Sequence, residues 1–239
     1  KQMNKFAALA PKDQRAIEFK SNPNYLNDLK SQSKLFDISP ATISSDKSDF
    51  GAVMADNNEV YFSSARNGSR KNASYNDEPY LDVYKAIYNE DGTLSEPTLV
   101  SEINTKWHDG PVAVSADGNT MYYGSESFNE SEFVKDKEKR LKFGKIYLYK
   151  VTKNGDKWSN SKALPFNNQA YSVRNPALSA DGKTLYFSSD MPGGMGGEDI
   201  YKVSVDGDTY GTPENLGSKV NTEGDESFPF VTDKVVLYF

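Results

Sequence analysis

Short stretches in which apolar and polar residues alternate recur along this chain in a single phase. The clearest copies are VSADGNTMYYGSE at Val114–Glu126 and LSADGKTLYFSSD at Leu178–Asp190, which begin 64 residues apart. A shorter relative runs from Met54 to Ala65, and a fourth, VTDKVVLYF, runs from Val231 to Phe239. Alternation with a period of two is typical of a half-buried β-strand, so each copy predicts a strand that follows a polar turn.

Two further patterns follow these copies in the same phase. An aliphatic residue followed by tyrosine indicates a third strand, at Val83-Tyr84, Ile146-Tyr147 and Ile200-Tyr201. A fourth segment then begins at Leu94, Trp158 and Tyr210, and the next connection opens with Asn104, Asn168 and Asn221. Because several independent signals keep one phase, they predict a structural repeat.

The third copy shows the repeating unit most clearly. It predicts strands at Pro176–Leu178, Thr184–Ser188 and Ile200–Val205, with a turn at Asp181-Gly182 and a fourth strand near Glu214–Leu216. A lone four-stranded sheet exposes two faces, so such units are stable when they pack beside one another in a ring. We therefore predict an all-β fold, a β-propeller of four-stranded blades, and keep a β-sandwich as the alternative.

Residues 1–34 differ in composition from the repeats. Pro11 suits the start of a helix and Pro23 suits a stop, so a short helical segment is expected there. The propeller is expected at residues 35–239, as three full blades and the start of a fourth. Residues Leu35–Ile38 precede the first blade at the offset of a fourth strand, which predicts that they complete the last blade, and further blades are expected beyond Phe239.

Composition narrows the function classes. Lys and Arg total 28 against 34 Asp and Glu, and the resulting net charge of −6 offers no attraction to nucleic acid. The chain has no cysteine, which removes disulfides, thiolate metal sites and a cysteine nucleophile. No apolar run approaches the roughly 20 residues that span a bilayer, and no signal-peptide pattern follows Lys1.

The segment SADGKTLYFSSDMPGGMGGEDIYKV, residues Ser179–Val203, resembles the WD40-like PD40 propeller repeat. The form it resembles belongs to exported Bacteroidetes envelope proteins that join tetratricopeptide-type helical repeats, a propeller and an OmpA-like peptidoglycan-binding domain. The first blade departs from the pattern, with Asn58 in place of glycine and no threonine.

The resemblance implies a PorE-type component of type IX secretion or gliding machinery. It also implies a six-bladed ring, a location in the periplasm at the outer membrane, and a PorP/SprF-like outer-membrane β-barrel as partner. Peptidoglycan binding would need the OmpA-like domain, which no residue of this chain matches.

Several polar residues are expected to support turns and no chemistry. Asp82 and Asp199 precede two of the third strands, where an aspartate accepts hydrogen bonds from turn amides, and Lys145 takes this place in the second blade. The loop PGGMGGED lacks the residues of a phosphate-binding loop, so its glycines are expected to adopt positive φ. The full set of expected turn residues is Asp82, Asp117, Gly118, Asp181, Gly182, Gly193, Gly194, Gly196, Gly197 and Asp199.

Neither a cofactor nor a metal ion is expected. Glu223, Asp225 and Glu226 lie close together, but the alternating oxygen ligands and the closing glutamate of a calcium loop are missing.

The link between the second and third strands varies in length. It spans 22 residues from Phe62 to Tyr84 and 24 from Tyr123 to Tyr147, against 14 from Phe187 to Tyr201. The first two blades therefore carry insertions, Asn67–Pro79 and Ser125–Phe143, at the end of the ring where the blades are joined. Insertions on a rigid frame commonly carry recognition, so we predict a partner-binding surface of Trp107, His108, Asp109, Phe128, Phe133, Tyr171 and Arg174.

These features favour a non-enzymatic protein-interaction scaffold of the bacterial cell envelope. His108 is the single histidine, and no nucleophile constellation accompanies it. The alternative is a glycan-binding or hydrolytic propeller that uses the central pocket. Converging carboxylates in an open funnel favour that alternative, whereas exposed aromatic side chains favour docking of a protein.

Overall fold

The computed structural model describes residues 2–33, 37–55, 57–73, 76–138 and 141–239. The chain divides into two compact units, Lys1–Pro40 and Ala41–Phe239. This division falls after residue 40, whereas the sequence analysis placed the boundary after residue 34. Residues 34–36 lie outside the described residues, and no strand is assigned from 37 to 40.

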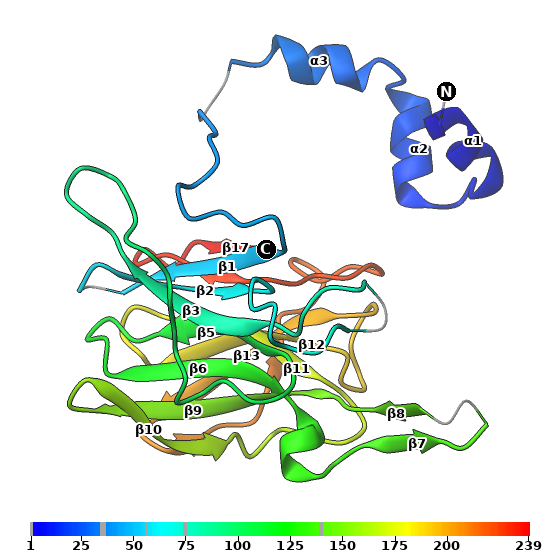
Figure 1. Cartoon of the computed structure of the whole chain (residues 1–239). Coiled ribbons are helices and arrows are strands. Elements are labelled where there is room, and N and C mark those ends of the chain that lie inside the picture. Colours follow the sequence, from blue (N-terminus) through cyan, green and yellow to red (C-terminus); the bar gives the residue numbers. More distant parts are fainter. Residues whose placement is uncertain (1, 34–36, 56, 74–75, 139–140) are drawn as a thin grey trace. The chain divides into compact units, whose positions relative to one another are not determined.

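The first unit contains three short helices, α1 (Gln2–Leu9), α2 (Gln14–Ser21) and α3 (Tyr25–Ser31) (Figure 1). Helix α2 begins after Asp13, whose carboxylate accepts the amide of Arg15 at 2.9 Å and so satisfies one of the free amides of the first turn. Ala7 of α1 and Ala16 of α2 are buried. The expected N-terminal helical segment is confirmed.

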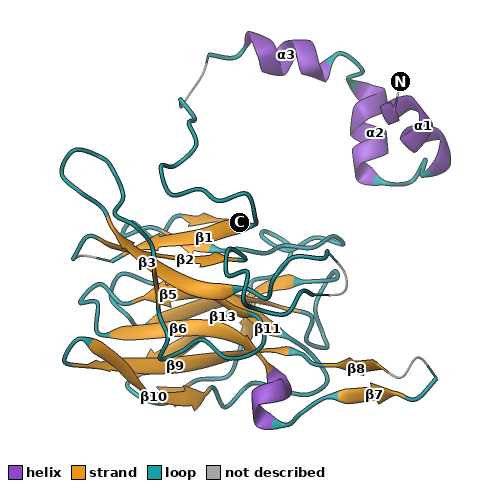
Figure 2. Ribbon diagram, viewed as in Figure 1, coloured by secondary structure: helices purple, strands orange, loops and turns teal. Residues whose placement is uncertain are grey.

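The second unit consists of successive antiparallel sheets, as predicted (Figure 2). The first blade is β1 (Asp49–Met54), β2 (Glu59–Ser64), β3 (Asp82–Ile87) and β4 (Thr98–Leu99). The second is β5 (Asp109–Val114), β6 (Thr120–Glu126), β9 (Ile146–Asn154) and β10 (Lys157–Ala163). The third is β11 (Val173–Leu178), β12 (Thr184–Ser189) and β13 (Asp199–Asp206), with β14 (Thr209–Tyr210) and β15 (Glu214–Asn215) both paired to β13.

Two smaller hairpins complete this unit. Strands β16 (Phe230–Val231) and β17 (Leu237–Tyr238) form the start of a fourth blade. After the 3-10 helix η1 (Ser127–Glu130), strands β7 (Val134–Asp136) and β8 (Leu141–Phe143) form a two-stranded arm that projects from the second blade (Figure 2). The fold class, a multi-blade β-propeller, is confirmed, and a total of six blades stays a prediction.

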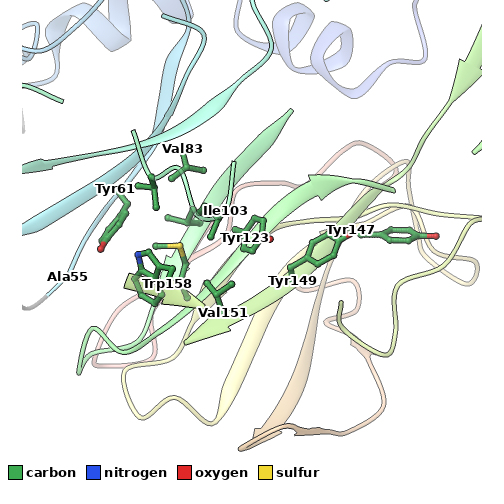
Figure 3. Packing of buried hydrophobic residues seen from close by; sticks show 12 residues of the cluster. Ala55, Tyr61, Val83, Ile103, Tyr123, Tyr147, Tyr149, Val151 and Trp158 are labelled. Atoms are coloured by element: carbon green, nitrogen blue, oxygen red, sulfur yellow. The ribbon is translucent and has the colours of Figure 1, made fainter. Parts of the chain in front are cut away.

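Neighbouring blades bury apolar side chains against each other. Tyr61 and Val83 of the first blade share a cluster with Met121, Tyr149 and Trp158 of the second (Figure 3). Tyr61 meets Trp158 edge to face, with ring centroids 6.1 Å apart. Full burial of one such side chain stabilises a fold by about 1.5–3 kcal/mol, so this packing supplies much of the stability that a single blade lacks.

The innermost strands of successive blades pack together around a central channel. Strand β1 contacts β5, β5 contacts β11, and β11 contacts β16. In the three full blades the register of this strand shifts in the same place, next to a residue with positive φ. Those residues are Gly51, Gly110 and Asn175, and Phe228 has positive φ just before β16. Each bulge turns the backbone of its inner strand at the channel wall.

The predicted Asp-Gly turns link the first strand of a blade to the second. In the second blade Asp117 accepts the Ser115 hydroxyl at 2.5 Å and the Asn119 amide at 3.0 Å, and Gly118 has a φ of 69°. The third blade repeats these contacts around Asp181, and Gly182 also has a φ of 69°. In the first blade Asn58 takes the left-handed position, at φ 61°. Asparagine tolerates this conformation better than other residues with a side chain, which explains why glycine is dispensable there.

One asparagine in each connection ties the blade together. Its side-chain oxygen accepts the amide, and its side-chain nitrogen donates to the carbonyl, of the same third-strand residue. The pairs are Asn104 with Val83 (2.7 and 2.9 Å), Asn167 with Leu148 (3.0 and 2.8 Å) and Asn221 with Ile200 (2.8 and 3.0 Å). The side chain thereby pairs an amide that the fourth strand no longer reaches, whereas the carbonyl of the same residue also accepts a backbone amide, from Val100, Leu164 or Leu216.

The sequence analysis assigned this position in the second connection to Asn168, which is wrong by one residue. The side chain of Asn168 instead accepts the amide of Ala170 at 2.9 Å in an exposed turn. Two adjacent asparagines satisfy the repeat pattern equally well, and only the position of Leu148 in space selects Asn167.

These adjacent asparagines provide a matched test. Asn167→Ala is expected to lower the free energy of unfolding by about 2 kcal/mol, because the amide of the buried Leu148 loses its partner. Asn168→Ala, which removes one exposed hydrogen bond, is expected to change it by less than about 0.5 kcal/mol. Urea unfolding followed by circular dichroism measures both, and equal losses in the two variants would contradict the assigned role.

Candidate functional site

The insertions and the connections between blades emerge at one end of the propeller. The insertions join β2 to β3 and β6 to β9, and the connections lead into the first residues of β5 and β11. Because the strands within each blade are antiparallel, these loops share an end, and the Asp-Gly turns lie at the other. This loop end holds the predicted partner surface.

Five rings form a continuous aromatic row at the loop end. Tyr80 meets His108 at 4.6 Å and Trp107 at 5.9 Å between ring centroids, both edge to face. Trp107 lies 4.5 Å from Phe128, which in turn lies 5.7 Å from Phe133. The connection before β5 thus meets the insertion that carries the arm, and four predicted partner residues, Trp107, His108, Phe128 and Phe133, are brought together. Tyr80, directly after the first insertion, was not predicted.

Lysine side chains lie over this aromatic row. The ammonium of Lys106 is 5.4 Å from the Trp107 ring, and those of Lys142 and Lys135 are 4.3 and 5.6 Å from the Phe133 ring. On the adjoining arm, Val134 and Phe143 pair across the two strands and are 59% and 50% exposed. The surface therefore combines apolar area with positive charge, although the chain as a whole carries a net charge of −6.

The first insertion, Asn67–Pro79, contacts the backbone that carries the aromatic row. Arg70 donates to the backbone carbonyls of Thr105 and Trp107 and forms an ion pair with Asp82 at 3.2 Å. Asn67 also donates to Asp82, at 2.9 Å. Asp82 was expected to accept turn amides, but it is buried and receives these two side chains instead. The insertion therefore fixes the backbone on which Trp107 stands.

His108 is held as a neutral ring. Its Nδ1 accepts the amide of Leu81 at 3.0 Å, which places the proton on Nε2. Burial, with a contribution from the charge of Arg70, lowers the pKa of His108 to about 4. The backbone amide of His108 bonds the Glu126 carboxylate, whose pKa burial raises to about 7. His108 thus serves to orient the aromatic row.

Asp109 is fully buried, so it does not itself reach a partner, contrary to its place in the predicted surface. Its carboxylate accepts the amide and hydroxyl of Thr105 and the hydroxyl of Ser125 at 2.6 Å. Burial raises the pKa of Asp109 to about 7 despite these hydrogen bonds. The aspartate closes the loop that presents Trp107 and His108.

The same closure recurs in other connections and was missed in the sequence. Asp49 accepts the amide and hydroxyl of Ser45, and Glu226 accepts those of Thr222, at 2.5 to 2.8 Å. The signal is a serine or threonine four residues before an acidic residue at the start of an inner strand or shortly before it. Once the blades are aligned, this spacing is visible in the sequence.

Tyr171 and Arg174 lie apart from the aromatic row. Tyr171 packs against the core between the second and third blades, and its hydroxyl donates to the carbonyl of Phe166 at 3.2 Å. Arg174 lies at the mouth of the central channel and pairs with Glu198 at 2.9 Å. The predicted surface therefore divides into an aromatic row and a channel mouth.

The channel mouth is a cavity of about 380 Å³. Its polar lining includes Arg174, Glu198 and Asp225, and its apolar lining includes Phe50 and Phe228. A second cavity of about 120 Å³ shares some of these residues and has mainly apolar walls along the inner strands. Charge is therefore concentrated at the opening of the channel.

The Gly-rich loop borders this mouth. Gly193 has a φ of 94°, as expected, whereas the expectation of positive φ is wrong for Gly194, Gly196 and Gly197, where close contacts require glycine instead. A Cβ on Gly196 would lie 2.2 Å from the carbonyl oxygen of Gly224, and one on Gly197 would lie 2.2 Å from the Asp225 carboxylate. A Cβ on Gly194 would meet the carboxylate of Asp199, which accepts the amides of Met195 and Gly196 in the predicted turn role.

Two of the three neighbouring carboxylates near residue 225, Asp225 and Glu226, accept hydrogen bonds from different partners. Glu226 binds Thr222, whereas Asp225 accepts the backbone amide of Glu198 at 3.0 Å. Within the described ranges, no group of three or more His, Cys, Asp or Glu residues is arranged to hold a metal ion. Over the same residues, no helix combines the length and apolar character needed to cross a membrane.

The buried Asp109 predicts a pH-dependent stability difference. Folded Asp109 keeps its proton up to about pH 7, whereas an unfolded aspartate loses it near pH 3.9, so wild-type stability falls as pH rises between these values. Asp109→Asn lacks this loss. Its free energy of unfolding relative to wild type is expected to rise by about 2 kcal/mol from pH 5 to pH 7.5.

When Asp109→Asn is compared with wild type, the contributions of the other titrating groups to the pH dependence cancel. The opposite contribution of His108, with its lowered pKa, and the similar one of Glu126 are present in both proteins and cancel. The exposed turn residue Asp156 provides the control, since Asp156→Asn is expected to differ from wild type equally at both pH values. A flat difference for Asp109→Asn would show that the carboxylate is ionised in the fold.

No protein-family model matches this chain, and no curated protein matches its sequence. Among solved structures, TolB from Acinetobacter baumannii is similar over 81% of this chain and 37% of its own, at 14% identity and a TM-score of 0.48. A puromycin-hydrolyzing peptidase from Mycobacterium tuberculosis is similar over 70% of this chain and 22% of its own, at 14% identity and a TM-score of 0.43. The chain thus spans well under half the length of each of these proteins.

Proposed function

We propose that this chain is a non-enzymatic scaffold that binds other proteins through the loop end of its propeller. The observation that carries the proposal is the aromatic row with its lysines, continued by the exposed Val134 and Phe143 on the arm. Tryptophan and other aromatic side chains dominate the binding energy of many protein interfaces. Here they stand on a backbone fixed by Arg70 and Asp109, which lowers the entropy lost on binding.

The charge of this surface indicates the kind of partner. Lys106, Lys135 and Lys142 surround the aromatic rings, so the complementary surface is apolar and bears acidic residues. The motif at Ser179–Val203 supports a cell-envelope setting through its resemblance to PD40 propellers. On that basis the chain works in the periplasm, in type IX secretion or gliding machinery, and docks on a PorP/SprF-like outer-membrane β-barrel.

The central pocket is the basis of the alternative, a glycan-binding or hydrolytic propeller. Its mouth does bring together two carboxylates, Glu198 and Asp225. Each has a structural partner, because Glu198 pairs with Arg174 and Asp225 accepts the amide of Glu198. A scaffold accounts for these contacts without assigning either acid to catalysis.

Removal of two rings at the aromatic row and the arm should weaken capture of the partner. Phe133→Ser combined with Phe143→Ser is expected to reduce recovery of an outer-membrane β-barrel protein about tenfold, which corresponds to a joint loss of about 1.4 kcal/mol of binding free energy from the two rings. The tagged chain is purified from crosslinked envelopes of its source bacterium, and the recovered β-barrel is quantified by mass spectrometry.

A matched control uses apolar residues at the opposite end. Ile87 and Tyr88 are 41% and 40% exposed, so Ile87→Ser with Tyr88→Ser makes a comparable change away from the aromatic row. This variant should recover the β-barrel as wild type does. If both double variants fold and recover the same amount, the aromatic row is not the docking surface.

Catalysis is expected to be absent. The purified chain should hydrolyse peptide, ester and glycoside substrates no faster than buffer, because His108 Nδ1 is occupied by the Leu81 amide and the channel acids have structural partners. Chromogenic substrates of each class provide the assay. Turnover that is abolished by His108→Ala or by Glu198→Gln would instead support the hydrolytic alternative.

A further inference from the structure

Phe228 occupies a backbone conformation that is costly for a large side chain. Its φ is 55°, in the left-handed region, at the position where the first two blades have Gly51 and Gly110 and the third has Asn175. Glycine takes this conformation freely and asparagine at low cost, whereas a bulky residue there is an outlier. Strain of this kind persists where the surroundings impose it and often accompanies a functional site.

The strained residue places an aromatic ring in the channel mouth. Phe228 is 52% exposed and borders both channel cavities. Its ring meets Phe50 of the first blade edge to face, at 6.0 Å between centroids. A ring that is fixed on one side and open on the other offers a face to a ligand.

The polar wall of the mouth has more negative than positive charge. Glu198 and Asp225 face a single cation, Arg174, which is already paired with Glu198 at 2.9 Å. The nearby Asp190 is neutralised by its own ion pair with Lys145. Burial and the charges of Asp225 and Asp190 raise the pKa of Glu198 even beside Arg174, so a second cation would stabilise the carboxylates.

We propose that the channel mouth binds a basic side chain, arginine or lysine, carried by a protruding segment of the partner protein. The charged head lies between Glu198 and Asp225, and its flat or methylene part packs on the Phe228 ring. Carboxylates and aromatic faces are the two groups that attract such cations most strongly. This inference rests on the proposed scaffold function and adds a second contact, separate from the aromatic row.

The test uses short peptides, so that no natural partner is needed. Acetyl-Gly-Arg-Gly-amide and its citrulline counterpart, which is neutral but similar in shape, are titrated into the full chain and followed by ligand-observed NMR. The arginine peptide is expected to bind with a Kd on the order of 1 mM, and the citrulline peptide about tenfold more weakly. Asp225→Asn should weaken arginine binding by a similar factor.

Phe228→Gly separates recognition from folding. Glycine relieves the left-handed strain, so the variant should unfold at an equal or higher urea concentration while it binds the arginine peptide about tenfold more weakly. Phe133→Ser, in the aromatic row, should bind the peptide as wild type does. If Phe133→Ser loses β-barrel capture but still binds the arginine peptide, the loss therefore concerns the aromatic row and not the channel mouth.

Four results would overturn the proposal. Equal binding of the citrulline peptide would show that charge is not recognised, and full binding by Phe228→Gly would show that the ring is not used. Preferential binding of acetyl-Gly-Asp-Gly-amide would assign the mouth to an anion held by Arg174. If the arginine peptide does not bind at concentrations up to about 20 mM, its affinity for the mouth is weaker than one charged and one aromatic contact supply.

Discussion

The structure depends on burial of each blade against its neighbours. A four-stranded sheet of this size cannot enclose its own apolar side chains, so Tyr61 of the first blade is buried only because Met121 and Trp158 of the second cover it. The next interface, which contains Leu148 and Phe187, repeats this arrangement. The repeat in the sequence follows from that requirement, since every blade has to present apolar residues in the same phase.

Packing of this kind creates a second requirement, which the asparagines meet. Strands β4 and β15 have two residues each, so they end before the start of the third strand is fully paired. Without the asparagines the amides of Val83 and Ile200 would be buried there without partners, at a cost of about 1–3 kcal/mol for each amide. Asn104 and Asn221 accept these amides and also donate to the carbonyls of the same residues, so short outer strands suffice.

A rigid frame of this kind makes the loop end suitable for recognition. The connections are closed by buried acids such as Asp109, and the first insertion is held through Arg70, so the aromatic row has little freedom to lose. At the channel mouth the same rigidity holds Phe228 in a conformation that it would not adopt alone. The buried polar contacts therefore determine which side chains face outward and can contact a partner.

The sequence by itself determined the strands, the blades and the Asp-Gly turns, because alternation and turn chemistry are local properties of a few neighbouring residues. It also brought Trp107 and Phe133 into one predicted surface, since Phe133 lies within an insertion and Trp107 lies in a connection at the same end of the blades. Only the tertiary structure decided that Asn167 and not Asn168 ties the second blade, that Asp109 is buried, and that Glu198 lies beside Arg174. Burial and the proximity of charges depend on which loops of different blades come into contact, and no local sequence pattern predicts those contacts.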